Sequence, residues 1–176
     1  MSDPYTPRPG DLGMVRMPGA VGKLIRAGQW LNGDGWADYQ HVYVVVGEVD
    51  GYEGPQIIEA MPGGALLSPL NRYDDFGPVY LRCPDYLRDD VAAAALGFRG
   101  VKYSALDYDA LALHRFHIPA PGLRRYIDAT GHMICSQLAD RAADLGGWHL
   151  FDDQRWPGYV TPLDIYSLYE KQLTQL

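Results

Sequence analysis

The chain has 176 residues, of which 47% are hydrophobic and 12% are aromatic. This is enough apolar material for one well-filled core and too little for two, so we predict a single ordered domain over residues 1–176. The formal net charge is -7, from 15 basic and 22 acidic residues. Such a chain has no surface that would neutralise phosphates, which argues against a nucleic-acid partner.

A membrane span is not expected either. The longest apolar run, residues 42–46, has the length of a strand and is far shorter than the roughly 20 residues that cross a bilayer. The opening segment MSDPYTPRPGD contains neither the basic nor the apolar region of a signal peptide. We therefore expect a cytoplasmic location, or delivery without a signal peptide, for example in a phage particle. In a reducing compartment Cys83 and Cys135 should both be free thiols.

The first half of the chain is predicted to be mainly antiparallel β-structure. The segment His41–Gly47 carries the strongest strand signal, because it is rich in β-branched residues and ends at a glycine. Apolar residues at helical spacing predict a helix at 21–31 that ends in the turn signal of residues 32–35. Strands 41–46 and 56–60 should pair as a hairpin around a turn-rich segment. The expected strands are residues 11–16, 41–47, 56–60, 65–69 and 78–83.

The second half changes to helical patterns. In the last expected helix Thr161 is a capping residue, and Pro162 follows it at the first helical position. A group of strands followed by a group of helices predicts an α+β domain in which an antiparallel sheet packs against helices. The expected helices are residues 85–98, 105–116, 132–145 and 161–169.

Cys135 lies in the first turn of the expected helix 132–145, which ends at two glycines. A thiol attacks a carbonyl as its thiolate, and the unpaired N–H groups and dipole at a helix N-terminus favour a negative sulfur. The same N–H groups can donate to a developing oxyanion. The positions that should share the buried face of this helix are Ile134, Leu138, Ala142 and Leu145.

His41 begins the strand 41–46, and Tyr43 and Val45 share its face. A histidine there is held by the sheet and can point toward a helix packed on that face. Such a base needs a third group to orient it, normally a carboxylate or amide on an adjacent strand. Glu59 is the candidate, because the predicted hairpin places Glu59 near His41 at its open end.

Four short motifs follow one another along the chain: Gly10-Asp11-Leu12, His41-Val42, Ile58-Glu59-Ala60 before a Pro-Gly-Gly step, and Ile134-Cys135-Ser136. Their order resembles the circularly permuted branch of the NlpC-type papain-like hydrolases, which includes the YiiX-like proteins and is related to the lecithin retinol acyltransferase group. In that family the histidine precedes the cysteine, the reverse of papain. The resemblance covers most of the chain, from Gly10 to the Pro162-Leu163-Asp164 segment.

The resemblance implies a permuted papain-like (NlpC-type) architecture with Cys135 as nucleophile, His41 as general base and Glu59 as the polar third member. It also implies a thiol hydrolase of the cysteine peptidase or amidase type, which cleaves an amide or ester bond through an acyl-enzyme without a cofactor. The partners would be peptide, amide or acyl substrates, including cell-wall peptides. Gln40 stands where a small residue is more usual in the family, and Gln40 or Tyr39 is expected to line the oxyanion pocket.

Other interpretations remain open at this point. Free cysteine is among the most buried residue types, so a cysteine is usually a packing residue, and this is our interpretation of Cys83. Zinc sites gather Cys and His in paired short spacings, which are absent here, so we expect no metal. The alternatives to a hydrolase are a non-catalytic papain-like module of a larger assembly and a lipid acyltransferase. The substrate and the oligomeric state are not determined by the sequence. The histidines weighed as zinc ligands are His114, His117, His132 and His149.

Overall fold

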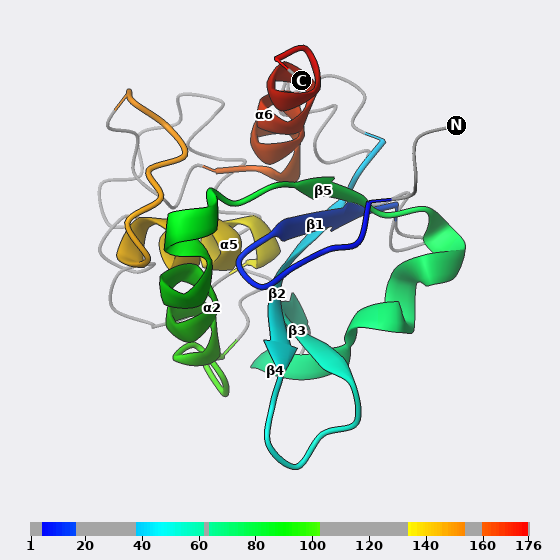
Figure 1. The fold of residues 1–176 in the computed structure, drawn as a ribbon. Helices are drawn as coiled ribbons and strands as arrows, with labels where there is room; N and C mark the ends of the chain where they lie inside the picture. The colour runs from blue at the N-terminus through cyan, green and yellow to red at the C-terminus, as the bar shows by residue number, and fades with distance from the viewer. Residues whose placement is uncertain (1–4, 17–37, 62–63, 103–133, 154–159, 176) are drawn as a thin grey trace, which may run out of the picture.

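A five-stranded antiparallel sheet lies at the centre of the part of the chain that the structure describes (Figure 1). The structure is a computed structural model, and it describes residues 5–16, 38–61, 64–102, 134–153 and 160–175. The strand order across the sheet is β4-β3-β2-β1-β5, and each pair of neighbours is antiparallel. The predicted α+β class is confirmed. The strands are β1 (Leu12–Val15), β2 (His41–Glu48), β3 (Pro55–Met61), β4 (Gly64–Pro69) and β5 (Val79–Leu81).

The helices differ from the predictions mainly at their ends. The expected helix 85–98 begins as a 3-10 turn and ends earlier, and the last helix continues to Leu173 instead of stopping at residue 169. The segment after β4 is a 3-10 helix that was not predicted, because only one of its residues, Tyr73, is buried and no apolar repeat marks it. The expected helices 21–31 and 105–116 lie outside the described residues. The described helices are η1 (Leu70–Phe76), η2 (Asp85–Leu87), α2 (Arg88–Leu96), α5 (Cys135–Leu145) and α6 (Pro162–Leu173).

The hairpin of β2 and β3 has the predicted pairing. Val44 lies opposite Ile58, and Tyr43 lies opposite Glu59, with a register shift between Val45 and Gly47. Because side chains alternate along a strand, Glu59 shares a face of the sheet with Tyr43 and therefore with His41.

The two faces of the sheet are covered by different elements (Figure 1). Val42 and Val44 pack in one large core with Leu138 of α5 and with residues of α2. On the opposite face, Tyr43 and Val45 pack in a smaller core with residues of β1, β3 and η1. The expectation that a helix packs on the face of His41 is therefore wrong, because α5 covers the opposite face, where Val42 and Val44 point.

The end of α5 lies very close to α2. A Cβ atom added to Gly146 would lie 2.6 Å from atoms of Val91, so only a glycine permits this approach. Ile134, Leu138 and Ala142 are fully buried as predicted. Leu145 is 64% exposed, which corrects the prediction that it shares their buried face, because it is the last residue of the helix and lies beyond the core.

Asp11, from the Gly10-Asp11-Leu12 motif, is a buried carboxylate that joins several segments. Its Oδ1 accepts hydrogen bonds from the backbone N–H of Cys83 (2.9 Å) and from the Arg88 guanidinium (2.7 Å). Its Oδ2 accepts from the Tyr5 hydroxyl (2.6 Å) and from the backbone N–H of Arg8 (2.8 Å). The start of β1 is thereby tied to the chain after β5 and to the first turn of α2. None of the helices in the described ranges is long and apolar enough to cross a membrane.

Candidate active site

His41 and Glu59 meet on the η1 side of the sheet, as the hairpin predicted. The Nε2–H group of His41 donates a hydrogen bond of 2.7 Å to Oε2 of Glu59. His41 is 4% exposed and Glu59 is completely buried. Glu59 lies opposite Tyr43, and Tyr43 is the next residue after His41 on the same face of β2, so the Glu59 side chain lies diagonally across from His41. The strand pairing alone therefore brings the imidazole and the carboxylate together.

Glu59 has further partners that the sequence did not reveal. Its Oε1 accepts a hydrogen bond of 2.5 Å from the Ser68 hydroxyl, and its Oε2 accepts one of 2.5 Å from the Tyr73 hydroxyl. Arg72 Nε lies 3.5 Å from Oε1. Burial alone would raise the pKa of Glu59, but the hydrogen bond and charge of His41 and the two hydroxyl donors lower it. Glu59 is therefore a carboxylate at neutral pH.

The pKa of His41 reflects its contact with two groups. Burial by itself lowers this pKa, but hydrogen bonds with Cys135 and Glu59, together with the negative charges of both, raise it to about 9. Because Nε2 is taken by Glu59, Nδ1 is the ring nitrogen left for the Cys135 sulfur. The arrangement stabilises an imidazolium between a thiolate and a carboxylate.

Cys135 reaches His41 although α5 packs on the other face of the sheet. Cys135 is the first residue of α5 and His41 is the first residue of β2, so the two side chains meet where both elements begin. The first helical hydrogen bond runs from the N–H of Leu138 to the carbonyl of Ile134 (3.0 Å). The N–H groups before it lie at the positive end of the helix dipole, which favours a negative sulfur.

Two neighbours of Cys135 anchor the start of this helix. Oε1 of Gln137 accepts a hydrogen bond of 3.2 Å from the backbone N–H of Ile134. The buried hydroxyl of Ser136 donates to the carbonyl of Val160 at 2.6 Å, just before α6. These contacts fix the first turn of α5, and with it the position of the sulfur.

Cys83 has a different environment. It is 3% exposed, and burial raises the pKa of its thiol to about 12. Within the described part of the chain, the groups that act on this pKa are Arg88, Asp11 and Asp85, whereas Cys135 contacts His41. This difference supports the interpretation of Cys83 as a packing residue.

The residues proposed for the oxyanion pocket lie directly before His41. Gln40 is completely buried, and its N–H donates to the carbonyl of Val15 at 3.2 Å. Tyr39 is 7% exposed, and its ring stacks on that of Tyr166 with the centroids 4.7 Å apart. A role for either residue at an oxyanion stays a prediction.

The histidines weighed as zinc ligands fall mostly on parts of the chain that are not described. His114, His117 and His132 lie outside the described residues. His149 is on the surface, where its Nδ1 pairs with Asp144 at 2.6 Å. Among the described residues, no group of three or more His, Cys, Asp or Glu side chains could hold a metal ion.

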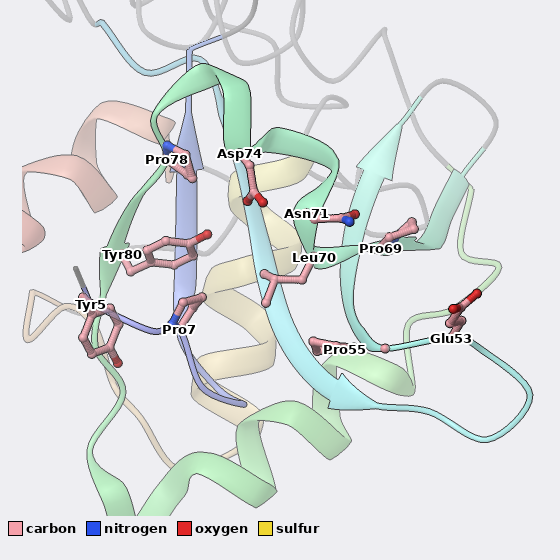
Figure 2. A pocket seen from close by; sticks show the side chains of 11 residues that line it. Tyr5, Pro7, Glu53, Pro55, Pro69, Leu70, Asn71, Asp74, Pro78 and Tyr80 are labelled. Carbon is pink, nitrogen blue, oxygen red and sulfur yellow. The ribbon is translucent and has the colours of Figure 1, made fainter. Parts of the chain in front are cut away.

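A cavity of about 460 Å³ opens on the η1 side of the sheet (Figure 2). Leu70 and Asp74 of η1 and Tyr80 of β5 are among the side chains that line it. His41, Glu59 and Cys135 do not line it. This cavity is therefore separate from the cluster of His41, Glu59 and Cys135.

Comparison with models of protein families found no match, and comparison with curated proteins also found none.

Proposed function

We propose that this protein is a cysteine hydrolase with a permuted papain-like architecture, in which Cys135 is the nucleophile. The observation that carries the proposal is the buried imidazole of His41, which hydrogen-bonds to both Glu59 and Cys135 at the N-terminus of α5. Activated nucleophiles of hydrolases have this arrangement: a nucleophile, a base within hydrogen-bond reach, and a third group that orients the base.

In the reaction, the thiolate of Cys135 attacks the carbonyl carbon of an amide or ester, and the electron pair of the C=O bond moves onto the oxygen. The oxyanion is stabilised by N–H groups of the first turn of α5. His41 then gives its proton to the leaving nitrogen or oxygen, and the bond to the leaving group breaks. A thioester between the acyl group and Cys135 remains.

The second half of the reaction regenerates the enzyme. Neutral His41 takes a proton from a water molecule, which attacks the thioester carbonyl, and Cys135 leaves as a thiolate. Throughout, Glu59 holds Nε2–H, which directs Nδ1 toward the sulfur and stabilises the imidazolium.

The permuted architecture is supported by the order and placement of these residues. His41 lies on β2 and Glu59 on the neighbouring β3, and Cys135 follows at the start of a later helix. This is the order, histidine before cysteine, that the resemblance to the permuted NlpC-type hydrolases implies.

A panel of substrates tests the proposal. Wild type, Cys135→Ala and Cys83→Ala should be assayed on peptidoglycan fragments, small amides and acyl esters, with release of acid and amine or alcohol measured by mass spectrometry. Loss of the nucleophile should lower turnover at least about 10³-fold in Cys135→Ala. Cys83→Ala serves as the matched control and should keep wild-type turnover. Turnover that survives in Cys135→Ala would contradict the assignment.

A second function is favoured by one observation. Cys135 is 2% exposed and His41 is 4% exposed, so both residues have little contact with solvent. This burial favours a non-catalytic module that keeps the papain-like fold as part of a larger assembly. A folded wild-type protein that turns over no member of the panel would support that module, and transfer of an acyl group to an added acceptor would indicate an acyltransferase.

A further inference from the structure

Two hydroxyl groups contact the carboxylate that orients His41. The Ser68 hydroxyl, from β4, donates to Oε1 of Glu59, and the Tyr73 hydroxyl, from η1, donates to Oε2, each at 2.5 Å. Ser68 is 2% exposed and Tyr73 is 5% exposed, so no bulk solvent replaces these donors. The carboxylate depends on the protein for its hydrogen bonds.

We propose that Tyr73 and Ser68 are positioning residues of this site, whose hydroxyls hold the Glu59 carboxylate in the place and charge state that His41 requires. The inference rests on the function proposed above and extends it to η1 and β4, two elements that do not carry a member of the Cys-His-Glu set.

The hydrogen-bonding geometry explains why both donors are needed. Oε2 is shared between His41 and Tyr73, while Oε1 is held by Ser68, so the carboxyl group cannot rotate without losing a bond. A buried carboxyl group with too few donors becomes a neutral acid, because burial disfavours its charge. A neutral Glu59 would no longer stabilise the imidazolium of His41.

The Tyr73 ring is itself held in place. It stacks on the ring of Tyr43, with the centroids 5.4 Å apart and an angle of 15° between the planes. The Tyr43 hydroxyl donates to the Tyr80 hydroxyl at 3.1 Å and has no bond to Glu59. Tyr43 is thus a buried tyrosine beside Tyr73 whose hydroxyl can be removed without removing a donor from Glu59.

Among the described residues, the polar groups that face Glu59 come from three elements. β2 contributes His41, whose other partner is Cys135, and η1 contributes Tyr73 and Arg72. The Arg72 side chain is 46% exposed and its Nε is 3.5 Å from the carboxylate, so solvent screens its charge. The hydroxyl of Ser68 on β4 is polar but not charged. In the described ranges, the two hydroxyls are therefore the donors other than His41 that act on Glu59 at short range.

Carbon-13 NMR of the glutamate carboxyl groups tests the proposal directly. The chain has four glutamates, and Glu59 is the buried one, since Glu48, Glu53 and Glu170 are exposed. A hydrogen bond to a charged group contributes about 1.5–3 kcal/mol, and one pKa unit is about 1.4 kcal/mol. The pKa of Glu59 should therefore rise by about one unit or more in Tyr73→Phe, and by a similar amount in the separate variant Ser68→Ala. It should not change in Tyr43→Phe.

The consequence for the thiol is measured by alkylation. As pH falls, Cys135 in Tyr73→Phe should lose its reactivity with iodoacetamide at a higher pH than in wild type, because Glu59 becomes neutral at a higher pH and then no longer stabilises the imidazolium beside the thiolate. The rate at pH 8, where Glu59 is charged in both proteins, should stay close to wild type. Ser68→Ala should behave in the same way, so the test survives if one variant fails to fold. Tyr43→Phe should follow the wild-type profile.

Two results would overturn the proposal. One is an unchanged Glu59 titration in both folded variants. The other is an alkylation rate of Cys135 that falls by the same factor at every pH. A purely structural role would lower the rate in this way without changing the pH at which reactivity is lost. The NMR titration of Glu59 needs no catalysis, so it can support the hydroxyl bonds even if wild-type Cys135 proves unreactive and the proposed hydrolase fails.

Discussion

Cys135 and Cys83 are buried to almost the same extent, yet their neighbours give the two thiols different chemistry. Their exposed fractions are 2% and 3%. Cys135 contacts His41, whose pKa is raised to about 9, whereas burial raises the pKa of Cys83 itself to about 12. Because exposure is matched, a difference in reactivity between the two thiols reports their thiolate content.

Alkylation at pH 7 should therefore discriminate between them. Cys135 should react with iodoacetamide at least about 10-fold faster than Cys83, because only Cys135 has an imidazolium to stabilise its thiolate. Peptide mass spectrometry after timed labelling measures both rates in one sample. In His41→Ala the rate at Cys135 should fall toward that of Cys83. Equal, slow labelling of both thiols in wild type would contradict the proposal that Cys135 is an activated nucleophile.

Among the elements, the antiparallel pair of β1 and β2 depends on a glycine. Gly13 lies opposite Tyr43, and a Cβ atom at this position would lie 2.1 Å from Cε2 of the Tyr43 ring. The ring is completely buried and stacks on Tyr73, so it has no free space to move into. The absence of a side chain at Gly13 thus leaves room for the Tyr43 ring, which stacks on the ring of Tyr73, a partner of Glu59.

Gly13→Ala should destabilise the protein by about 1–3 kcal/mol, the usual cost of overpacking a core. Denaturant unfolding of Gly13→Ala, Tyr43→Ala and the double variant measures this as a double-mutant cycle. The alanine methyl should fit once the ring is gone, so the double variant should lose less stability than the sum of the single losses. Additive losses would show that the ring does not oppose the methyl group.

For the molecule as a whole, the buried pair of Asp11 and Arg88 joins segments far apart in the sequence. The Arg88 side chain is 9% exposed and the Asp11 side chain is completely buried. Asp11 also accepts a hydrogen bond from the backbone N–H of Cys83, and the Arg88 guanidinium donates one to the carbonyl of Pro9 at 3.1 Å. Removing the charge of Asp11 would leave the buried Arg88 guanidinium with the exposed Asp85 as its charged partner.

Asp11→Asn should lower the free energy of unfolding by about 3–5 kcal/mol, because the Arg88 charge stays buried. Asp85→Asn is the matched control, since Asp85 also bonds to Arg88 but its side chain is 76% exposed, and it should lose much less stability. Urea unfolding at neutral pH compares the two. A similar loss in both variants would mean that the charge of Asp11 is not the cause.

The sequence by itself determined the strands, the β2–β3 hairpin and the nearness of Glu59 to His41. These features follow from local patterns: alternating side chains, runs of β-branched residues and a glycine at the strand end each involve only a few residues. Once the register of one hairpin is known, the residues that face each other on its two strands are known too. Thr161 also caps α6 as predicted, accepting the N–H of Asp164. The helices 21–31 and 105–116 remain predictions.

Only the tertiary structure decided which face α5 covers and what surrounds Glu59. Ser68 and Tyr73 follow Glu59 by 9 and 14 residues, and Tyr73 belongs to a 3-10 helix without an apolar repeat. The contact of Cys135 with His41 was implied by the family resemblance and by no local pattern, because it joins the beginnings of a strand and a helix that lie far apart in the chain. Local patterns carry no signal for such contacts, because they arise when whole elements pack and the buried polar groups find partners.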